Sequence, residues 1–495
     1  MLIKTLRKKR DEGVGHWFIL VLLALAQFMV VLDVSIVNVA LPSIQKAFNM
    51  TADNLQWIVT AYSLAFGGFL LLGGRAADLF GRKKIFLIGV AGFTFASFLT
   101  GVSTSGLMIV MARILQGFFG AFMSPAALSI VLVIYKEGKD RNVALSVWGA
   151  VAASGAAVGV LLGGILTQYL DWRWNFFINV PVGILVVLTA YFILPKHQGE
   201  SKQRGFDVIG AVLVTGGLMA LVYALVKAPN EGWTSSLALT YFAISIVSLT
   251  LFVINESRSK HPILPLKIFK IRNIVGADLS QLALAAGLFS VFFFLTLYMQ
   301  DILNYSPVRT GFNFLIIPVT IGVVAANVPK IIAKIGFKPV LVIAPLFVST
   351  GLFVLSHVRV NGTFWHDVAP GMIIFALGLG ATFVSITIAA TSGVSKQESG
   401  LSSGLLTTAQ QIGGAIGLAI LTGVVTSSST HYLKTHLSAA MPKPTPELMD
   451  AASVHGIQRG FLLASTFGIL ASLISLIVIK PVKVDPNQKP PVATH

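Results

Sequence analysis

The stretch WFILVLLALAQFMVVLDVSIVNVALP, residues 17–42, decides the fold because it is long and apolar and carries a single acid, Asp33. As a helix, residues 17–40 extend about 36 Å at 1.5 Å per residue, which exceeds the roughly 30 Å core of a bilayer. Asp33 then lies inside the membrane, where a carboxylate is costly unless it is paired, protonated or in contact with water. We expect a function for Asp33; the alternative is a structural contact between helices.

The composition of the whole chain indicates a membrane protein. Of its 495 residues, 55% are hydrophobic and only 11% are charged, which is too apolar for a set of soluble domains. The chain has no cysteine, which excludes disulfides and thiolate metal sites, and we expect no metal and no cofactor. The basic start, followed by a long apolar run with no small-residue cleavage site, predicts an uncleaved first span rather than a signal peptide.

Apolar runs of about 18 residues or more predict an all-α polytopic membrane protein with fourteen transmembrane helices. These runs lie near residues 17–40, 55–73, 85–103, 107–134, 142–169, 175–194, 208–227, 237–255, 274–299, 311–328, 338–357, 366–391, 401–427 and 457–479. The outer loop after the thirteenth helix, about 428–456, is the longest predicted non-membrane stretch, and its run PKPTPE, residues 442–447, is predicted to be an extended linker.

The net charge of +17 follows the predicted topology. An even number of spans puts both termini on one side, where the loops and tails hold 27 of the 36 Lys and Arg; the opposite side holds 8, and Arg113 lies within a span. Lys and Arg resist translocation, so both termini are predicted to be cytoplasmic and the protein to lie in the cell inner (plasma) membrane. The basic excess is explained by topology, and we expect no nucleic-acid partner.

The two ends of the chain share features that lie about 255 residues apart. GRKKIFLIGV begins at Gly81 and GFKPVLVIAP at Gly336, and a pair of glycines in the fifth span recurs in the thirteenth at an offset of 254. These repeats predict a duplicated six-helix unit. The expected organisation is a six-helix bundle over 1–194, a linker with two extra transmembrane helices and inner loops over 195–273, and a second six-helix bundle with the tail over 274–495. Carriers built from two such parallel halves bind substrate between them near the membrane midplane.

Glycines spaced four residues apart let helices approach closely, because no side chain separates the backbones. In the fifth and thirteenth spans we expect them to form contacts between the two bundles; ordinary static packing is the alternative. These glycines are Gly155, Gly159, Gly163, Gly164, Gly413 and Gly417.

Asp33 and Arg113 are predicted to meet. Each lies six or seven residues from the outer end of its predicted span, so both are roughly 10 Å below the outer surface. An arginine beside a carboxyl group favours its ionised form, whereas loss of water favours the protonated form, so a motion that separates the two would change proton binding. Asp278 also enters a span, in its first turn or two, and is expected to snorkel or to cap the helix, with a transport role as the alternative.

Known catalytic motifs are absent. There is no G-x-x-x-x-G-K-[ST] phosphate loop, no H-E-x-x-H and no G-x-S-x-G, so an ion gradient is the expected energy source and the protein is not expected to be an enzyme.

The short inner loop between the second and third spans combines glycines, an acid and basic residues. A positive-inside anchor explains its basic residues, but not its acid and its glycines. Asp78 can dock at a helix N-terminus, where the helix dipole favours negative charge, and the start of the thirteenth helix is one candidate. The candidate latch residues are Gly74, Asp78, Gly81, Arg82 and Lys83.

This loop, G-x-x-A-D-x-x-G-R-K from Gly74, resembles the loop signature of the major facilitator superfamily, and Arg113-x-x-Gln116-Gly117 resembles its fourth-helix motif. LDVSIVNVALP (residues 32–42) is similar to the first-helix motif of the fourteen-helix drug:proton antiporters, and QWIVTAYSL (56–64) and DWRWNFFINVPVG (171–183) resemble that family too. The resemblance implies secondary active export of hydrophobic or cationic compounds in exchange for protons. By position, Asp33 and Arg113 would couple protons, and Asp78 and Arg82 would latch the cytoplasmic side. The antiporter motif G-P-x-x-G-G departs here to GVLLGG (159–164), which loses a proline bend.

The expected partners are a small-molecule substrate, protons and the lipid bilayer, with the protein acting as a monomer. A narrow exporter of one metabolite, and a non-transporting membrane receptor on the same fold, are the alternatives. The candidates to line a substrate cavity are Gln27, Asn38, Tyr62, Trp148, Tyr298, Asn313 and Gln410, each with helix packing as the alternative.

Overall fold

The computed structural model describes residues 14–135, 139–194, 207–392, 396–437 and 444–481. Within these ranges it has fourteen helical segments that are long and apolar enough to cross a membrane, which confirms the predicted all-α polytopic fold. The main helices are α2 (Val14–Phe48), α4 (Trp57–Phe80), α5 (Arg82–Gly101), α6 (Gly106–Ile134), α7 (Lys139–Tyr169), α9 (Asn179–Ile193), α10 (Val208–Glu231), α11 (Ser236–Arg258), α12 (Arg272–Leu297), α14 (Ile316–Ile335), α15 (Phe337–Leu355), α16 (Ala369–Thr391), α17 (Lys396–His436) and α18 (Pro446–Val478).

Short helices adjoin several of these spans. α3 (Ala52–Leu55), α8 (Trp174–Phe177) and α13 (Pro307–Phe314) precede α4, α9 and α14, and η2 (Leu266–Lys270) is a 3₁₀ turn before α12. Two π-helical turns, η3 (Tyr298–Ile302) and η4 (Phe364–Val368), follow α12 and precede α16. The spans are therefore joined by compact connections.

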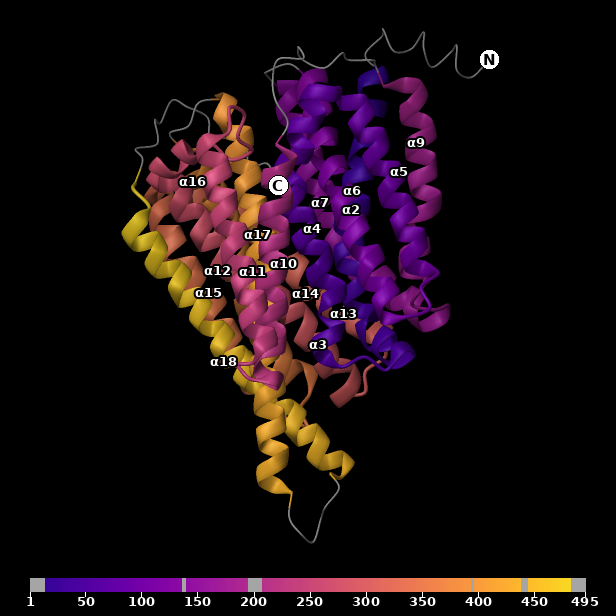
Figure 1. Cartoon of the computed structure of the whole chain (residues 1–495), viewed down its shortest axis with the longest axis vertical. Helices are drawn as coiled ribbons and strands as arrows, with labels where there is room; N and C mark the ends of the chain where they lie inside the picture. Colours follow the sequence, from indigo (N-terminus) through magenta and orange to yellow (C-terminus); the bar gives the residue numbers. More distant parts are fainter. Residues whose placement is uncertain (1–13, 136–138, 195–206, 393–395, 438–443, 482–495) are drawn as a thin grey trace.

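The predicted outer loop at about 428–456 is helical at both ends, and of the predicted linker PKPTPE residues 442–443 lie outside the described residues, whereas Pro446 and Glu447 begin α18. α17 and α18 continue through residues 428–436 and 446–456 as a helical hairpin, which projects from one end of the molecule (Figure 1). Thr445 caps α18 by accepting a hydrogen bond from the Leu448 amide. Pro446 lies in the first turn of α18, where the backbone amide that proline lacks would have no partner within the helix. Local capping chemistry thus outweighs the proline-rich composition.

The helices form two groups with an inserted pair. We call α2–α9 the N-terminal group and α12–α18 the C-terminal group. In Figure 1 the N-terminal group, from indigo to magenta, and most of the C-terminal group, from rose through orange to yellow, lie on opposite sides, while α13 and α14 overlap the N-terminal group in this view. α10 packs against α4 and α17, one helix from each group, and α11 packs against α10. The domain boundaries at residues 194 and 273 stay a prediction.

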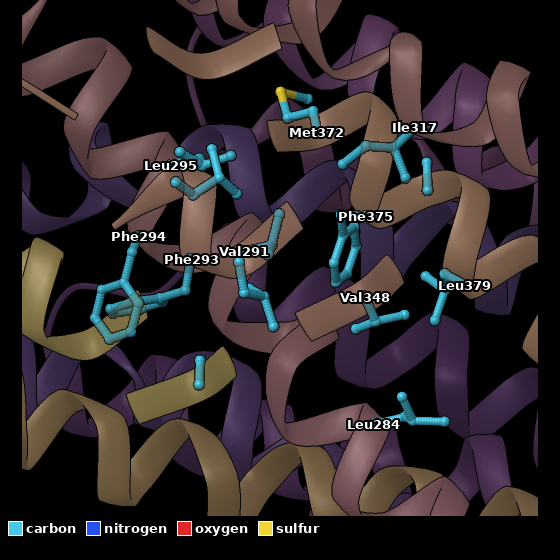
Figure 2. Packing of buried hydrophobic residues seen from close by; sticks show 14 of the residues in the cluster. Leu284, Val291, Phe293, Phe294, Leu295, Ile317, Val348, Met372, Phe375 and Leu379 are labelled. Atoms are coloured by element: carbon cyan, nitrogen blue, oxygen red, sulfur yellow. The ribbon is translucent and has the colours of Figure 1, made fainter. Parts of the chain in front are cut away.

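A large part of the buried core lies in the C-terminal group. Figure 2 shows side chains of α12 and α16 facing those of α14 and α15, with Phe375 beside Val348 and Ile317. These residues are fully or almost fully buried. The packing holds α12, α15 and α16 together.

Gly81 and Gly336, which begin the two similar segments in the sequence, lie at equivalent helix junctions. Gly81 joins α4 to α5 with φ of 95°, and Gly336 joins α14 to α15 with φ of 80°. Both backbones are in a region that L side chains rarely adopt, so glycine is required at both junctions. The same turn therefore ends the second helix of each group, as a duplicated unit requires.

Candidate functional site

Asp33 and Arg113 meet in the interior of the N-terminal group. Arg113 Nη1 of α6 donates to Asp33 Oδ2 of α2 over 2.5 Å, and neither side chain is exposed. A buried ion pair stabilises little by itself, but the loss of one partner leaves an uncompensated charge. Removal of either partner is therefore expected to weaken the contact between α2 and α6.

Two amides complete the surroundings of the carboxylate. Gln116 Nε2 donates to Asp33 Oδ1 over 2.8 Å, and Asn179 Nδ2 of α9 donates to the same oxygen over 3.1 Å. Gln116 Oε1 also accepts from Arg113 Nη1 at 2.7 Å. No role was predicted for Gln116 or Asn179 from the sequence. Both lie in segments that resemble family motifs, residues 113–117 and 171–183, and this position is the signal that could have identified them.

A second set of contacts fixes the donors. Arg113 Nε donates to the Ile58 carbonyl over 3.0 Å, and the guanidinium lies 4.2 Å from the centre of the Tyr62 ring. Asn179 Nδ2 also donates to Ser97 Oγ, which in turn donates to the Phe176 carbonyl. α4, α5 and α8 thus hold in place the groups that α2, α6 and α9 aim at the carboxylate.

Gly117 explains how α6 comes close enough to α4. A Cβ atom at this position would lie 2.3 Å from the Tyr62 carbonyl oxygen, which no real contact allows. Without a side chain at Gly117, the two backbones approach so that Arg113 reaches the Ile58 carbonyl. The glycine after Gln116 is therefore part of the site's construction.

The arrangement favours an ionised carboxylate. All three side chains bonded to Asp33 donate, and a carboxylate accepts through both oxygens, whereas a protonated carboxyl group needs an acceptor for its own hydrogen. Proton uptake at Asp33 would remove the negative charge to which Arg113 is bonded and so weaken this pair. Among the residues that the structure describes, Tyr62 Oη and Arg113 Nη2 are buried without a hydrogen-bond partner, so the site keeps unused hydrogen-bonding capacity beside the pair.

The loop residues make contacts within the N-terminal group. Arg82 Nη2 pairs with Asp78 Oδ1 at 3.1 Å, one helical turn away, and Lys83 Nζ donates to the Tyr191 and Leu194 carbonyls at the end of α9. Docking of Asp78 at the thirteenth helix stays a prediction, because residues 393–395 before α17 lie outside the described residues. A Cβ at Gly74 would meet Pro125 only at an ordinary 3.7 Å.

The prediction that the spaced glycines join the two bundles requires correction. Only Gly164 of α7 faces the other group, with its Cβ position 2.5 Å from the Pro307 carbonyl oxygen in α13. Cβ positions on Gly155, Gly159 and Gly163 face α2, and those on Gly413 and Gly417 face α12, so both sets pack the fifth helix of a group against its first. The glycines thus placed within a group are Gly155, Gly159, Gly163, Gly413 and Gly417.

The seven candidates for a substrate cavity lie in different surroundings. Gln27 accepts from Ser124 Oγ, and Asn38 donates to the carbonyl of Val34 in its own helix. The hydroxyl of Tyr298 donates to the Arg359 carbonyl, which is a contact at the end of α12. The remaining candidates are Tyr62 and Trp148, which are buried, Asn313, which contacts the Met299 sulfur, and Gln410, which is half-buried.

Contacts between the two groups gather at the end predicted to be outer. Lys46 at the end of α2 pairs with Asp301 of η3 at 3.3 Å, and Gln300 donates to the Val39 carbonyl over 2.9 Å. Thr426 donates to Asp53 over 3.0 Å at the same end. A hydrogen bond from Thr408 to the Gly67 carbonyl lies deeper.

Comparisons with known proteins agree with this architecture. A family model described as Major Facilitator Superfamily matches residues 23–418. A puromycin resistance protein of Streptomyces alboniger is 37% identical over 468 residues, 94% of this chain and 90% of that protein. A tetracenomycin C resistance and export protein of Streptomyces glaucescens is 32% identical, over 92% of this chain and 86% of that protein. A multidrug resistance protein of Mycobacterium tuberculosis is 31% identical, over 86% of this chain and 79% of that protein.

The fold also resembles solved transporters. A bacterial homologue of the human lysosomal transporter Spinster, in an inward-facing and unoccupied conformation, superposes with a TM-score of 0.67 at 15% identity, over 94% of this chain and 97% of that one. A peptide transporter of the POT family gives the same TM-score at 13% identity, over 94% of this chain and 97% of that one.

Proposed function

This chain belongs to the Major Facilitator Superfamily, and on that premise we propose that it exports small hydrophobic or cationic compounds in exchange for protons. The proposal is supported by relatives over 30% identical across most of the chain, whose names describe resistance to, or export of, antibiotics. Resistance is common to these three names, and one of them also names export. Whether one compound or many are carried is tested by efflux of chemically different antibiotics.

Proton coupling is proposed from the carboxylate of Asp33. Its three donors satisfy the ionised form, and protonation removes the negative charge that attracts the guanidinium, so the pair with Arg113 is the contact that weakens most when Asp33 takes up a proton. Release of Arg113 loosens α6 from α2, because this pair joins the two helices. Proton binding at Asp33 thus changes the packing of α6 against α2. This change in packing is proposed to couple proton entry to substrate export.

The transport cycle is proposed to rock the N-terminal group against the C-terminal group. The contacts at the outer end, which include the pair of Lys46 with Asp301, fit a conformation that is closed to the outside. Gly164 lets α7 and α13 touch in this conformation. The loop with Asp78 and Arg82 is proposed to latch the cytoplasmic side in the opposite conformation.

The protein is proposed to act as a monomer in the cell inner membrane with both termini in the cytoplasm. The excess of Lys and Arg on the side of the termini supports this orientation. Energy then comes from protons that enter the cell down their gradient.

The experiment is transport in reconstituted vesicles with an imposed pH gradient. An antibiotic cation such as puromycin is the first probe, and movement of both the probe and protons is recorded. We expect the native chain to couple the two, and Asp33→Asn to remain folded but to lose proton-driven movement. Undiminished pH-driven movement in Asp33→Asn would falsify the coupling role, and no movement of any tested compound by the native chain would contradict the transport function.

A further inference from the structure

A second acid, Asp278, lies in the membrane outside the Asp33 network. It is six residues from the start of α12, which corresponds to about 9 Å along the helix. The expected capping role is wrong, since the N-cap position of α12 is Ile271. Snorkelling also fails, because the single methylene of aspartate is too short to carry the carboxyl group over that distance.

Asp278 lacks the partners that Asp33 has. Its Oδ1 is buried without a hydrogen-bond donor, and no ion pair or hydrogen bond to this side chain exists in the part of the chain that the structure describes. The nearest charged residue on the same helix, Arg272, is exposed and donates instead to the Ile477 carbonyl. An ionised carboxylate in such surroundings is strongly disfavoured relative to its neutral form.

The elements packed against α12 carry their charged groups mostly near their ends, and among the described side chains none is bonded to Asp278. α16 has no charged residue, and the side chains of Lys396 and Glu398 at the start of α17 lie outside the described residues. The charged and titratable groups on the elements packed against α12 are His16, Asp33 and Lys46 on α2, Lys267 and Lys270 on η2, Tyr298 and Asp301 on η3, Lys338 on α15, His431, Tyr432, Lys434 and His436 on α17, and Glu447, Asp450, His455 and Arg459 on α18.

The neighbouring side chain of Gln281 also has a buried oxygen without a hydrogen-bond donor among the described residues. Gln281 follows Asp278 by three residues, so the two side chains adjoin on the helix surface. Gln281 is 2% exposed, and its Oε1 also has no donor. Asp278 Oδ1 and Gln281 Oε1 both accept hydrogen bonds, and both lack a donor among the described residues. A proton on the Asp278 carboxyl group would supply a hydrogen that Gln281 Oε1 can accept.

We propose that Asp278 is a second proton-binding group, which holds a proton in this conformation and releases it when α12 and its neighbours rearrange. In the release the O–H bond breaks, the proton passes to water, and a carboxylate remains. Asp33 lies nineteen residues, about 28 Å, from the start of α2, so the two acids occupy different depths. A proton that enters from outside would reach Asp33 first and Asp278 second. Proton binding at Asp278 is independent of the proposed function, whereas its part in coupling rests on it.

Infrared spectroscopy of the full-length protein in lipid tests this directly, because a protonated carboxyl group has a carbonyl stretching band that a carboxylate lacks. At neutral pH we expect such a band in the native chain and its loss in Asp278→Asn. Asp301→Asn is the matched control, since this acid is already paired with Lys46, and it should leave the band intact. Gln281→Leu should shift the band to the frequency of a carboxyl group without an acceptor.

The proposal is overturned if the native chain has no such band, or if Asp278→Asn leaves the band unchanged. If Asp278→Asn does not fold, Asp278→Glu replaces it, and a band that moves rather than disappears supports the assignment, whereas an unmoved band refutes it. A parallel measurement with a pH indicator should find one proton fewer per chain released on alkalinisation of Asp278→Asn. Neither measurement needs a transported compound, so the export proposal can fail without affecting the result.

Discussion

Replacing Asp33 with asparagine should cost about 3–5 kcal/mol of unfolding free energy. The substitution keeps the size of the side chain but leaves Arg113, which has no exposed surface, as a buried charge without its counter-ion, and that range is typical for breaking a buried pair from one side. An asparagine amide would also point a donor at groups that already donate. Since membrane and soluble domains alike have limited stability, of the order of 5–15 kcal/mol, the variant should remain folded but be clearly weaker.

A double-mutant cycle measures this coupling. Asp33→Asn, Arg113→Gln and the double variant are unfolded by titration with a denaturing detergent, and the double variant should lose much less than the sum of the two single losses. Asp78→Asn is the control, because its pair with Arg82 is partly exposed and should contribute at most about 1 kcal/mol. Single variants that unfold like the native chain, or losses that simply add, would refute the buried network as described.

Three further outcomes follow from the same geometry. Asn179→Leu removes a donor from the carboxylate and should lower the unfolding free energy by about 1–3 kcal/mol in the same titration. Gly117→Ala should destabilise by a similar 1–3 kcal/mol or so, because its Cβ would lie 2.3 Å from a backbone oxygen of α4, whereas Gly216→Ala, with nothing within 4 Å, should be neutral or slightly stabilising. Lys46→Cys combined with Asp301→Cys should be joined by a reducible bifunctional thiol cross-linker that spans the length of the replaced lysine side chain, and the cross-link should stop export until it is reduced; the absence of native cysteine makes the assay specific. Export that continues with the cross-link intact would contradict closure at this end.

The membrane spans could be predicted from the sequence because each depends on a local property, a run of apolar residues long enough to cross a bilayer. The same property identified Asp33 and Arg113 as ionisable groups that need partners. Where the expectation failed, the reason was also physical. At the end of the predicted PKPTPE linker, Thr445 caps α18, so Pro446 and Glu447 are helical.

What the sequence by itself determined about this protein is its class, its number of spans, the family resemblance and the two charges that must meet inside the membrane. Only the tertiary structure decided what surrounds them, since Gln116 and Asn179 lie 83 and 146 residues from Asp33 and are brought to it by the packing of α6 and α9 against α2. The spaced glycines illustrate the same limit. Their spacing predicts a close helix contact, but which helix fills the gap depends on the whole bundle, and for all but Gly164 it is a helix of the same group.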